Sequence, residues 1–363
     1  MAEHKSKILI TLKLNGQNGG PYTSHFRIMN DEYLRNKYEF CSLSVPRART
    51  LINPFGFFSF VRSIKNAKPD AVHIAGLQLD GFLVMAACKW ARVKTILAIH
   101  GSSSEAMNFG SLRRFLSFFV EARTIKRADI VYGVSDYVSS WEICKYAKRY
   151  FGTIYNLTSF DSNYSDASTI REELKIKDND IVVTSTGRIT VEKGYDILKE
   201  VVLRCGDVPN IKFIIAGDGP YRNAMENAFL ASSMRDKVFL LGYRSDISNI
   251  LSGSDIFIIC TKHETLCISL LEAGFFRLPL IATNVGGIPE IIDSDCGYLI
   301  ENGNVDGFTS ALRELVNDAS KRVSFGEMAR KKIDEKFSRA SIIKKIDCLY
   351  EEVLKYHGKQ KKK

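Results

Sequence analysis

The chain reads Ile-Val-Val-Thr-Ser-Thr-Gly-Arg-Ile-Thr-Val-Glu-Lys-Gly over residues 181–194, a β-rich run that ends in a loop bounded by two glycines. Apolar residues then recur with helical spacing over residues 195–203. A strand, a loop and a helix form the repeating unit of an open parallel sheet, whose ligands bind outside the carboxyl ends of the strands. Arg188 and Lys193 in this loop therefore suit a diphosphate, although two ordinary charges on a solvated loop are the alternative.

Two glutamates stand eight positions apart in His-Glu-Thr-Leu-Cys-Ile-Ser-Leu-Leu-Glu-Ala-Gly, residues 263–274. Glu264 precedes an expected apolar helix and Glu272 lies two turns into it, on roughly the same face. Free backbone N–H groups between them suit phosphate, and the carboxylates suit the hydroxyls of a hexose and a ribose. The spacing therefore indicates a nucleotide-sugar site, although the helix dipole alone also favours an acid near a helix start.

Further apolar runs end in sharp turns. Residues 211–216 lead into Gly217-Asp218-Gly219-Pro220, where the glycine backbone can approach a ligand closely. A simple tight turn is the alternative. The other runs alternate with helical segments, which predicts a parallel α/β sheet. These runs lie at 238–243, 255–259 and 279–290.

The order of these motifs resembles the retaining glycosyltransferases of family four, the glycosyl transferases group 1. The shared motifs are Gly-Arg-x4-Lys-Gly from 187, Gly-Asp-Gly-Pro from 217, Glu-x7-Glu-Ala from 264, Gly-Gly-x-Pro-Glu from 286 and Gly-Tyr-Leu from 297. They cover essentially all of residues 180–300. The resemblance implies an α/β fold in which two Rossmann-like doubly wound domains face each other across a cleft, the GT-B fold, and it implies retention of the sugar's anomeric configuration.

The resemblance also implies roles for single residues. Arg188 and Lys193 would hold the diphosphate, Glu264 would bind sugar hydroxyls, and Glu272 would accept hydrogen bonds from the ribose. The residues expected to contact the donor nucleotide are Gly19, Gly20, Gly187, Gly217, Asp218, Gly219, Tyr243, Leu266, Cys267, Ile268 and Glu272.

The N-terminal half begins with a predicted strand at 7–14 and a glycine-rich loop at 15–24. The glycines do not follow the Gly-x-Gly-x-x-Gly spacing, and no acid ends a second strand at the required distance, which argues against a nicotinamide cofactor. The loop resembles the family's first loop, which faces the donor diphosphate and the acceptor. Asn15 and Gly16 are therefore expected on the acceptor side.

Three later strand ends supply further candidates. His100 ends the run 95–99, where an imidazole can donate a hydrogen bond to a sugar hydroxyl or steady developing charge; a structural histidine is the alternative. Ser135 matches the family's serine-bearing turn before a helix. Asn156 lies where relatives show Pro-Asn-Gly, although its flanking residues depart from that pattern.

These segments predict two domains. An N-terminal Rossmann-like, acceptor-binding domain is expected at 1–160, and a C-terminal Rossmann-like, nucleotide-sugar-binding domain at 179–339. Residues 161–178, rich in Ser, Asp and Asn, are the expected linker. Helical periodicity at about 340–356 predicts a helix that, by resemblance, packs back on the first domain. With 363 residues, 45% of them hydrophobic, the chain is long enough for two full cores.

Composition narrows the remaining classes. No apolar run approaches the roughly 20 residues of a membrane-spanning helix, and residues 1–14 lack signal-peptide features. Eight scattered cysteines without paired metal spacing indicate a reduced, cytoplasmic protein without structural zinc. Asp293-Ser294-Asp295 imitates the metal motif of the other glycosyltransferase fold, but it is expected in a surface loop. We therefore expect no cofactor and no required metal, with the nucleotide-sugar as co-substrate.

The net charge of +10 is unevenly placed. Residues 1–165 carry 22 Lys and Arg against 12 Asp and Glu, whereas residues 166–363 carry 29 of each. Two basic, aromatic segments at 55–65 and 112–120 have helical spacing and two explanations: contact with an anionic membrane surface, or ordinary packing of an apolar stripe on the core. No recognition motif supports nucleic acid as the partner of this charge.

The sequence therefore predicts a retaining hexosyltransferase that moves a sugar from a nucleotide-sugar to a glycan or lipid-linked acceptor, in bacterial envelope polysaccharide synthesis such as lipopolysaccharide or capsule. UDP is favoured over GDP from its frequency among relatives. His100, Arg188, Lys193 and Glu264 are the expected catalytic residues, with same-face attack on the sugar and transfer of the acceptor proton to the leaving phosphate. The alternatives are a nucleotide-sugar epimerase, a sugar phosphorylase, and a non-catalytic nucleotide-sugar-binding subunit.

Overall fold

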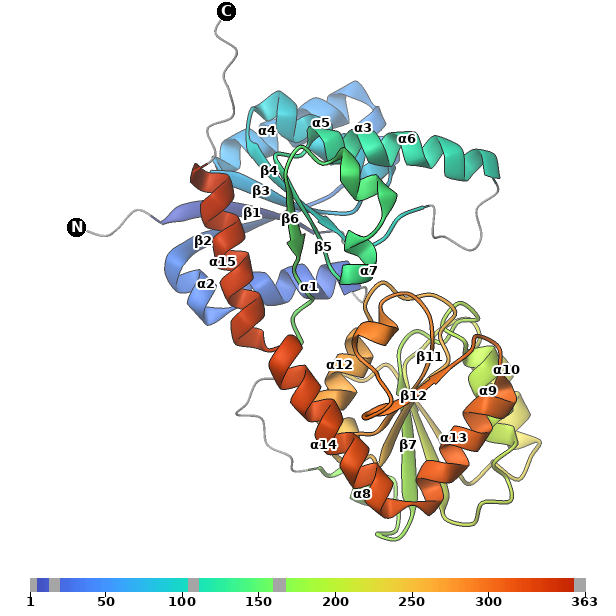
Figure 1. Cartoon of the computed structure of the whole chain (residues 1–363). Coiled ribbons are helices and arrows are strands. Elements are labelled where there is room, and N and C mark those ends of the chain that lie inside the picture. Colours follow the sequence, from blue (N-terminus) through green and yellow to red (C-terminus); the bar gives the residue numbers. More distant parts are fainter. Residues whose placement is uncertain (1–4, 13–19, 104–110, 159–167, 356–363) are drawn as a thin grey trace, which may run out of the picture. The chain divides into compact units, whose positions relative to one another are not determined.

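The computed structural model describes residues 5–12, 20–103, 111–158 and 168–355, without the side chains of 111–114. The chain divides into two compact units, which are described separately. The first unit comprises Met1–Leu157 together with Arg339–Lys363, and the second comprises Thr158–Ser338. Each contains one six-stranded sheet in which every pair of neighbouring strands is parallel, flanked by helices (Figure 1). The predicted α/β fold class, with two doubly wound domains, is confirmed.

The first unit has the strand order β2-β1-β3-β4-β5-β6. Its inner strands are apolar and buried on both faces, as parallel strands covered by helices must be. The chain leaves β1 for β2 on one side and then returns to β3 on the other. The elements are β1 (Ser6–Leu12), α1 (Gly20–Met29), α2 (Glu32–Lys37), β2 (Tyr38–Ser44), α3 (Ala48–Ile52), α4 (Pro54–Ala67), β3 (Ala71–Ala75), α5 (Leu79–Ala91), β4 (Lys94–Ile99), α6 (Ser111–Arg127), β5 (Ile130–Gly133), α7 (Asp136–Ser139), η2 (Glu142–Tyr146), β6 (Tyr150–Thr153) and α15 (Arg339–Lys355).

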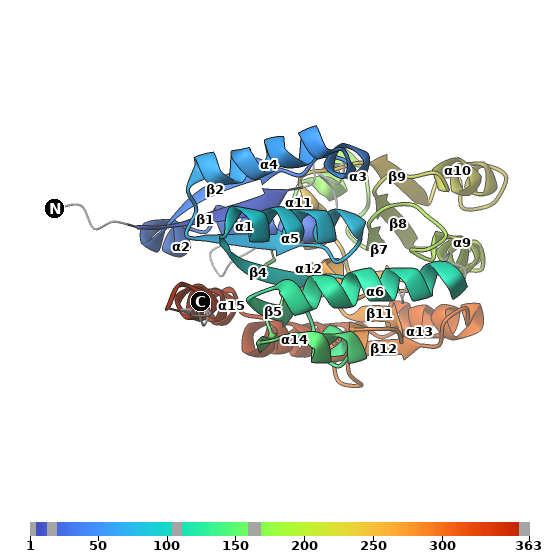
Figure 2. The ribbon, with the colours of Figure 1, turned by 90° about the horizontal axis from the view of Figure 1, so that it is seen from above.

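Helices cover both faces of this sheet. Helices α3, α4, α5 and α6 form a layer on one face, with α5 between α4 and α6, whereas α1 and α2 lie on the opposite side (Figures 1 and 2). The C-terminal helix α15 belongs to this unit although it follows the second unit in sequence. Its Asp347 accepts hydrogen bonds from the Tyr38 hydroxyl at 2.6 Å and the Lys37 ammonium at 2.8 Å. Burial of Ile346, Leu349 and Val353 completes this contact.

The second unit has the strand order β12-β11-β10-β7-β8-β9. Alternate strand residues face opposite sides, so Val183 and Phe213 pack beneath α9, α10 and α13, whereas Val182 and Ile214 pack beneath α8 and α11. The elements are α8 (Ile170–Glu173), β7 (Ile181–Thr186), α9 (Tyr195–Leu203), β8 (Ile211–Ala216), α10 (Arg222–Leu230), β9 (Val238–Gly242), α11 (Ile247–Ser252), β10 (Ile256–Ile259), α12 (Ile268–Phe275), β11 (Leu280–Thr283), η3 (Ile288–Glu290), β12 (Gly297–Ile300), α13 (Val305–Asn317) and α14 (Ala319–Lys336).

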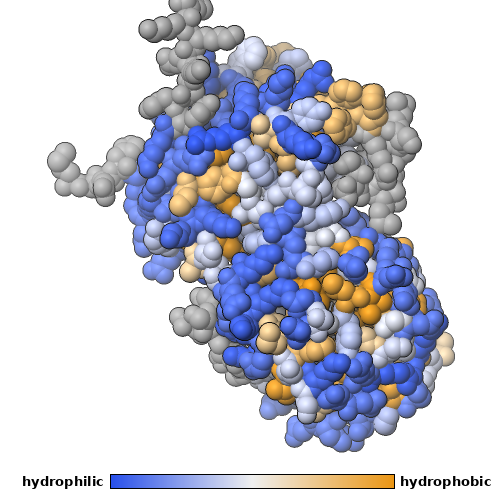
Figure 3. All heavy atoms as spheres, viewed as in Figure 1, coloured by the Kyte–Doolittle hydropathy of each residue, from blue (hydrophilic) through white to orange (hydrophobic). Residues whose placement is uncertain are grey.

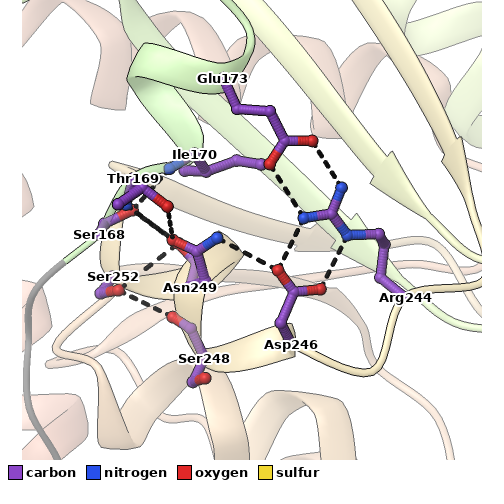
Figure 4. Close-up of polar contacts among 9 residues, drawn as sticks. All are labelled: Ser168, Thr169, Ile170, Glu173, Arg244, Asp246, Ser248, Asn249 and Ser252. Atoms are coloured by element: carbon purple, nitrogen blue, oxygen red, sulfur yellow. Dashed lines mark hydrogen bonds and ion pairs between the residues drawn. The ribbon is translucent and has the colours of Figure 1, made fainter.

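The described part of the predicted linker 161–178 packs on the second unit. The Ser168 hydroxyl donates to the backbone carbonyl of Asn249 at 2.7 Å, and the Thr169 amide donates to the Asn249 side chain at 2.8 Å (Figure 4). Ile170 is fully buried at the start of α8. The polar residues that suggested a linker therefore form hydrogen bonds to α11, and α8 packs at one edge of the core.

In the part of the chain that the structure describes, no helix is both long enough and apolar enough to cross a membrane. All eight cysteines lie in this part and are free, six of them buried.

Candidate functional site

The second sheet has a topological switch point between β7 and β10. The chain starts at β7, runs outward to β8 and β9, and returns to β10 on the other side of β7. The loops after β7 and β10 therefore diverge, and ligands of doubly wound sheets bind at such a point. Lys193 comes from the first loop and Glu264 from the second, and their Nζ and Oε1 atoms lie 2.5 Å apart. The structure thus brings together two sequence motifs whose charged residues are 71 positions apart.

Both members of this pair are largely buried, with 23% of the Lys193 side chain and 12% of the Glu264 side chain exposed. Burial lowers the pKa of Lys193, but the charge of Glu264 and the hydrogen bond to it raise the pKa by more, so the net direction is upward. The ammonium therefore stays charged. The Arg188 charge is close enough to oppose this rise. Arg188 is exposed and forms no ion pair with the described residues. The switch point therefore has two cations, Arg188 and Lys193, and one carboxylate, Glu264.

Glycines let the loops at this end of the sheet approach one another. Gly194 has a left-handed φ of 71°, and a Cβ there would overlap the backbone carbonyl of Cys260 after β10. The Lys262 amide donates to the Glu192 carbonyl at 3.0 Å, and the Lys262 ammonium pairs with Asp196 at 2.6 Å. These contacts fix the loop of Lys193 against the loop of Glu264.

Replacing Gly194 with alanine is expected to lower the free energy of unfolding of the second unit by about 2 kcal/mol, because left-handed strain and a backbone overlap act together. Gly303→Ala is the matched control, since Gly303 has a φ of 83° but no atom within 4 Å of an added Cβ. It should cost about 1 kcal/mol from strain alone. Urea unfolding followed by circular dichroism measures both. If both variants lost the same free energy of unfolding, the close approach of Gly194 to Cys260 would not contribute to stability.

The turns after β8 and β9 pack next to the loop that follows β7. The Gly217 amide donates to the Gly242 carbonyl at 2.7 Å, and the Gly187 amide donates to the Ala216 carbonyl at 3.0 Å. A Cβ on Gly217 would overlap the carbonyl of Gly187, and one on Gly219 would overlap that of Ile189. The Asp218 carboxylate accepts a hydrogen bond from the Gly219 amide at 2.7 Å. The predicted glycine turns therefore support the loop of Arg188.

Tyr243 follows β9 with 68% of its surface exposed. The next residue, Arg244, pairs with Glu173 at 2.7 Å and Asp246 at 2.6 Å (Figure 4). Hydrogen bonds to Arg244 hold the pKa of both carboxyl groups below their usual range. This network anchors the chain directly after Tyr243 and leaves the phenol ring exposed.

Helix α12 begins at the strand ends with its first amides uncapped by a side chain. Its N-cap residue Cys267 makes no capping hydrogen bond, and burial raises the pKa of the Cys267 thiol to about 12. The neighbouring Leu266 is also buried, and Ile268 starts the helix. Free N–H groups at a helix N-terminus attract phosphate. Glu272 lies in the second turn of α12 and is 8% exposed.

His100 follows β4 in the first unit, and the two serines shortly after it bond to a buried acid. Glu121 of α6 is fully buried, accepting a hydrogen bond from the Ser102 hydroxyl at 2.5 Å and from the Ser103 amide at 2.7 Å. These bonds tie the chain after His100 to α6. Glu121 was not predicted, although a lone acid in the 17-residue stretch Ser111–Arg127 was a signal that could have found it.

His100 belongs to a cluster of three histidines, of which His25 and His73 are fully buried and His100 is partly buried. The His25 ring centroid lies 4.3 Å from that of His73 and 5.7 Å from that of His100. Burial lowers the pKa of His25 to about 4 and, together with the His25 charge, that of His100 to about 3; the pKa of His73 is also well below its usual value. His100 is therefore neutral near pH 7, which supports a hydrogen-bonding role and not the stabilisation of charge by an imidazolium.

The other first-unit candidates differ in their placement. Ser135 is fully buried, and its hydroxyl accepts a hydrogen bond from the Val138 amide at 3.1 Å as the N-cap of α7. This placement does not support the predicted contact of Ser135 with an acceptor. Asn156 is 5% exposed, and Gly20 opens α1. The candidates Asn15, Gly16 and Gly19 lie outside the described residues.

The described residues contain no group of three or more His, Cys, Asp or Glu side chains that is arranged to hold a metal ion. Asp293, the first acid of the triplet that imitates a metal motif, pairs with Lys332 at 2.6 Å, and this hydrogen bond lowers its pKa.

Known protein families match both halves of the chain. The profile described as "Glycosyl transferases group 1" matches residues 166–332, and the profile "Glycosyltransferase Family 4" matches residues 29–146.

Three individual proteins that match this chain share at most about a third of its residues in the aligned regions. N-acetyl-alpha-D-glucosaminyl L-malate synthase of Bacillus anthracis is 26% identical over 73% of this chain and 69% of its own length. UDP-Gal:alpha-D-GlcNAc-diphosphoundecaprenol alpha-1,3-galactosyltransferase of Escherichia coli is 30% identical, but the match spans only 49% of this chain and 47% of that protein. The solved structure of Anabaena HepE in complex with UDP and glucose matches with a TM-score of 0.77 at 19% identity, over 96% of this chain and 100% of that one.

Proposed function

Because the chain belongs to the glycosyltransferases of group 1 and family 4, we propose that it transfers a sugar with retention of configuration from a UDP-sugar to a glycan or lipid-linked acceptor. The two doubly wound units have the GT-B fold. The observation that carries the proposal is the Lys193–Glu264 pair at the switch point of the second sheet, next to the exposed Arg188. A surplus of positive charge at that point suits a diphosphate.

In this proposal the donor nucleotide lies on the second unit. Arg188, Lys193 and the first amides of α12 hold the diphosphate, and Glu272 accepts hydrogen bonds from the ribose. Glu264 orients Lys193 through their ion pair and has acceptor capacity left for a sugar hydroxyl. The HepE complex with UDP and glucose supports UDP as the nucleotide; GDP is the second choice.

The chemical step follows from this placement. The acceptor hydroxyl attacks the anomeric carbon on the face from which the phosphate leaves. A new C–O bond forms as the bond to the phosphate oxygen breaks, and the acceptor proton passes to that oxygen. Arg188 and Lys193 stabilise the negative charge that grows on the diphosphate, so the proposal includes no metal step. His100, as a neutral hydrogen-bonding group on the first unit, positions the donor sugar.

The proposed acceptor is a lipid-linked glycan of a bacterial envelope polysaccharide. Support comes from the E. coli relative, whose name gives a diphosphoundecaprenol-linked sugar as its acceptor. The excess of 22 Lys and Arg over 12 Asp and Glu in residues 1–165 also suits an acceptor presented at an anionic surface. We place the reaction in the cytoplasm, at the inner face of the cell membrane.

A thermal-shift screen against UDP, GDP, ADP and NAD tests the donor. UDP is expected to raise the melting temperature, because a ligand that binds only the folded state stabilises it by about 2.7 kcal/mol at one hundred times its Kd. Arg188→Ala should reduce this shift, whereas Arg235→Ala, an exposed arginine before β9 and so at the opposite end of the strand, should not.

Turnover assays with UDP-glucose, UDP-galactose and UDP-N-acetylglucosamine then follow. Slow release of one sugar as its α-anomer, seen by proton NMR, is expected for a retaining transferase. Conversion of one UDP-sugar into another without an acceptor would instead identify an epimerase, and release of a sugar phosphate from a glycan would identify a phosphorylase. UDP binding with no turnover of any donor would identify a binding subunit. A shift with NAD alone would overturn the proposed site.

A further inference from the structure

Helix α6 has an unusual distribution of apolar and charged side chains. Phe115, Leu116 and Phe119 are between 42% and 59% exposed, and Figure 3 shows apolar residues at the surface over this helix. Glu121, the only acid in the sequence of the helix, is instead fully buried. A helix that packs on a sheet normally buries its apolar stripe and exposes its charges. The placement of Glu121 is the reverse of this pattern.

The buried carboxylate of Glu121 pairs with no cation among the described residues. Its two oxygens accept hydrogen bonds from the Ser102 hydroxyl at 2.5 Å and from the Ser103 amide at 2.7 Å. Burying a carboxylate is costly, and two hydrogen bonds from neutral groups offset only part of that cost. An apolar side chain of similar volume would stabilise the first unit at least as well. Stability alone therefore does not explain a glutamate at this position.

Both hydrogen-bond donors lie in the short loop that carries His100. Strand β4 ends at Ile99, and His100 is the first residue after it. The His100 ring is arranged edge-to-face with the His25 ring of α1, with centroids 5.7 Å apart and ring planes at 79°. The ring thus packs on α1, while Glu121 ties the following backbone to α6. Removing the carboxylate would break bonds at two consecutive residues of this loop.

We propose that Glu121 is a positioning residue for sugar transfer, whose carboxylate holds residues 101–103 so that the His100 ring keeps the place from which it binds the donor sugar. This inference rests on the proposed function, in which His100 positions that sugar. A displacement of about 1 Å in a reacting group can cost about 100-fold in rate. Glu121 acts through geometry and not through its charge, so a neutral side chain that makes the same two bonds should replace it.

Three variants of the full chain test this role. Glu121→Ala is expected to lower kcat by about 10- to 100-fold and to leave the thermal shift by UDP unchanged. Glu121→Gln should restore kcat to within about threefold, because the glutamine oxygen accepts from the Ser103 amide and its NH2 group donates to the Ser102 hydroxyl. Ile125→Ala is the matched control, since Ile125 is fully buried one turn further along α6. It should destabilise the first unit without removing a hydrogen bond and keep kcat within about twofold.

The same substitution in a chain that carries His100→Ala tests whether Glu121 acts through His100. Glu121→Ala should then slow kcat by less than about twofold, because the group that it positions is already absent. Equal slowing in both backgrounds would overturn the proposal. So would a kcat as low in Glu121→Gln as in Glu121→Ala, which would point to the charge, or as low in Ile125→Ala, which would point to stability. Circular dichroism checks that every variant is folded.

Hydrogen exchange at the Ser103 amide, followed by mass spectrometry, tests the bond without any substrate. Exchange should be slow in the natural chain and in Glu121→Gln, and faster in Glu121→Ala. Equal exchange in all three would overturn the proposal. A natural chain that turns over no nucleotide-sugar would contradict the proposed function, and this inference with it. Turnover that Glu121→Ala leaves unchanged would contradict the positioning role alone.

Discussion

Replacing Lys193 with alanine is expected to lower kcat for sugar transfer by about 30- to 1000-fold, a loss of about 2–4 kcal/mol of transition-state stabilisation. Lys193 is one of the two cations at the switch point of the second sheet, and in the proposed function the charge on the leaving diphosphate grows as the glycosidic bond breaks. An interaction that strengthens in the transition state changes kcat more than KM. Steady-state kinetics with the donor selected by thermal shift measure both constants.

Lys199→Ala is the matched control for this variant. Lys199 lies in α9, six positions further on, and pairs with its neighbour Glu200 at 3.0 Å. Its removal should leave kcat within about twofold, because a partly exposed pair of this kind contributes little. If Lys193→Ala turned over the donor as fast as the natural chain, Lys193 would have no part in the mechanism.

A second comparison separates chemistry from positioning, because Lys193→Ala also leaves Glu264 without its 2.5 Å partner. If Lys193 acts on the phosphate, the double variant Lys193→Ala with Glu264→Ala should have a lower kcat than Glu264→Ala alone. If Lys193 only holds Glu264 in place, the double variant should be no slower than Glu264→Ala. Thermal melting of each variant shows whether a buried carboxylate without a partner has destabilised the second unit.

The strands of the second unit were predictable because their sequences carry two signals of a buried parallel strand: a run of strand-forming residues and a glycine turn directly after it. The run 181–186 is rich in β-branched residues and the run 211–216 is largely apolar. Both end in glycine turns, and the structure places β7 and β8 at these residues. Strand β2 (Tyr38–Ser44) lacks these signals and was missed. It forms an edge of the first sheet, and after the buried Tyr38 its residues are only partly buried or exposed, so hydrophobicity alone does not reveal it.

Local sequence predicted the candidate residues at the switch point but not their contacts. Lys193 and Glu264 were assigned to separate motifs, and only the strand order, with β7 beside β10, brings their charged atoms together. Ser135 shows the converse. A serine before a helix suits either a ligand or an N-cap, and the local sequence is the same in both cases. The burial and the N-cap bond of Ser135 depend on the packing of the whole first unit, which the local sequence does not show.

The histidine cluster could not be predicted from the sequence, because its contacts depend on packing and not on a local motif. His25, His73 and His100 come from α1, β3 and the end of β4, and no motif connects them. Only His100 was singled out. In the structure the His73 ring nitrogens lie 3.0 Å from the hydroxyls of Tyr350 and Tyr132, so the cluster also joins α15 to the sheet.

This cluster predicts that the first unit loses stability steeply in mild acid. The folded state holds His25 neutral down to about pH 4 and His100 down to about pH 3, with His73 also well below its usual value. In the unfolded chain each histidine binds a proton below about pH 6.5. As the pH falls below 6.5 the unfolded state therefore binds more protons, so stability present above pH 6.5 is lost.

The expected slope is large. Each histidine contributes up to about 1.4 kcal/mol per pH unit, so three together approach about 4 kcal/mol per unit near pH 5, against a typical total of about 5–15 kcal/mol. Urea unfolding followed by tryptophan fluorescence isolates this effect, because Trp90 and Trp141 are both in the first unit. The window from pH 6 to pH 5 lies above the range in which ordinary carboxyl groups protonate.

His73→Gln is the informative variant, since glutamine can hydrogen-bond to both tyrosine hydroxyls and does not titrate. It should reduce the slope by about one third, and the variant should therefore gain stability relative to the natural chain as the pH falls. A slope below about 1 kcal/mol per pH unit in the natural chain would mean that the histidines take up protons in the folded state. His100 would then be cationic in mild acid, and within the proposed function a role in stabilising charge would replace the role of a neutral hydrogen-bonding group.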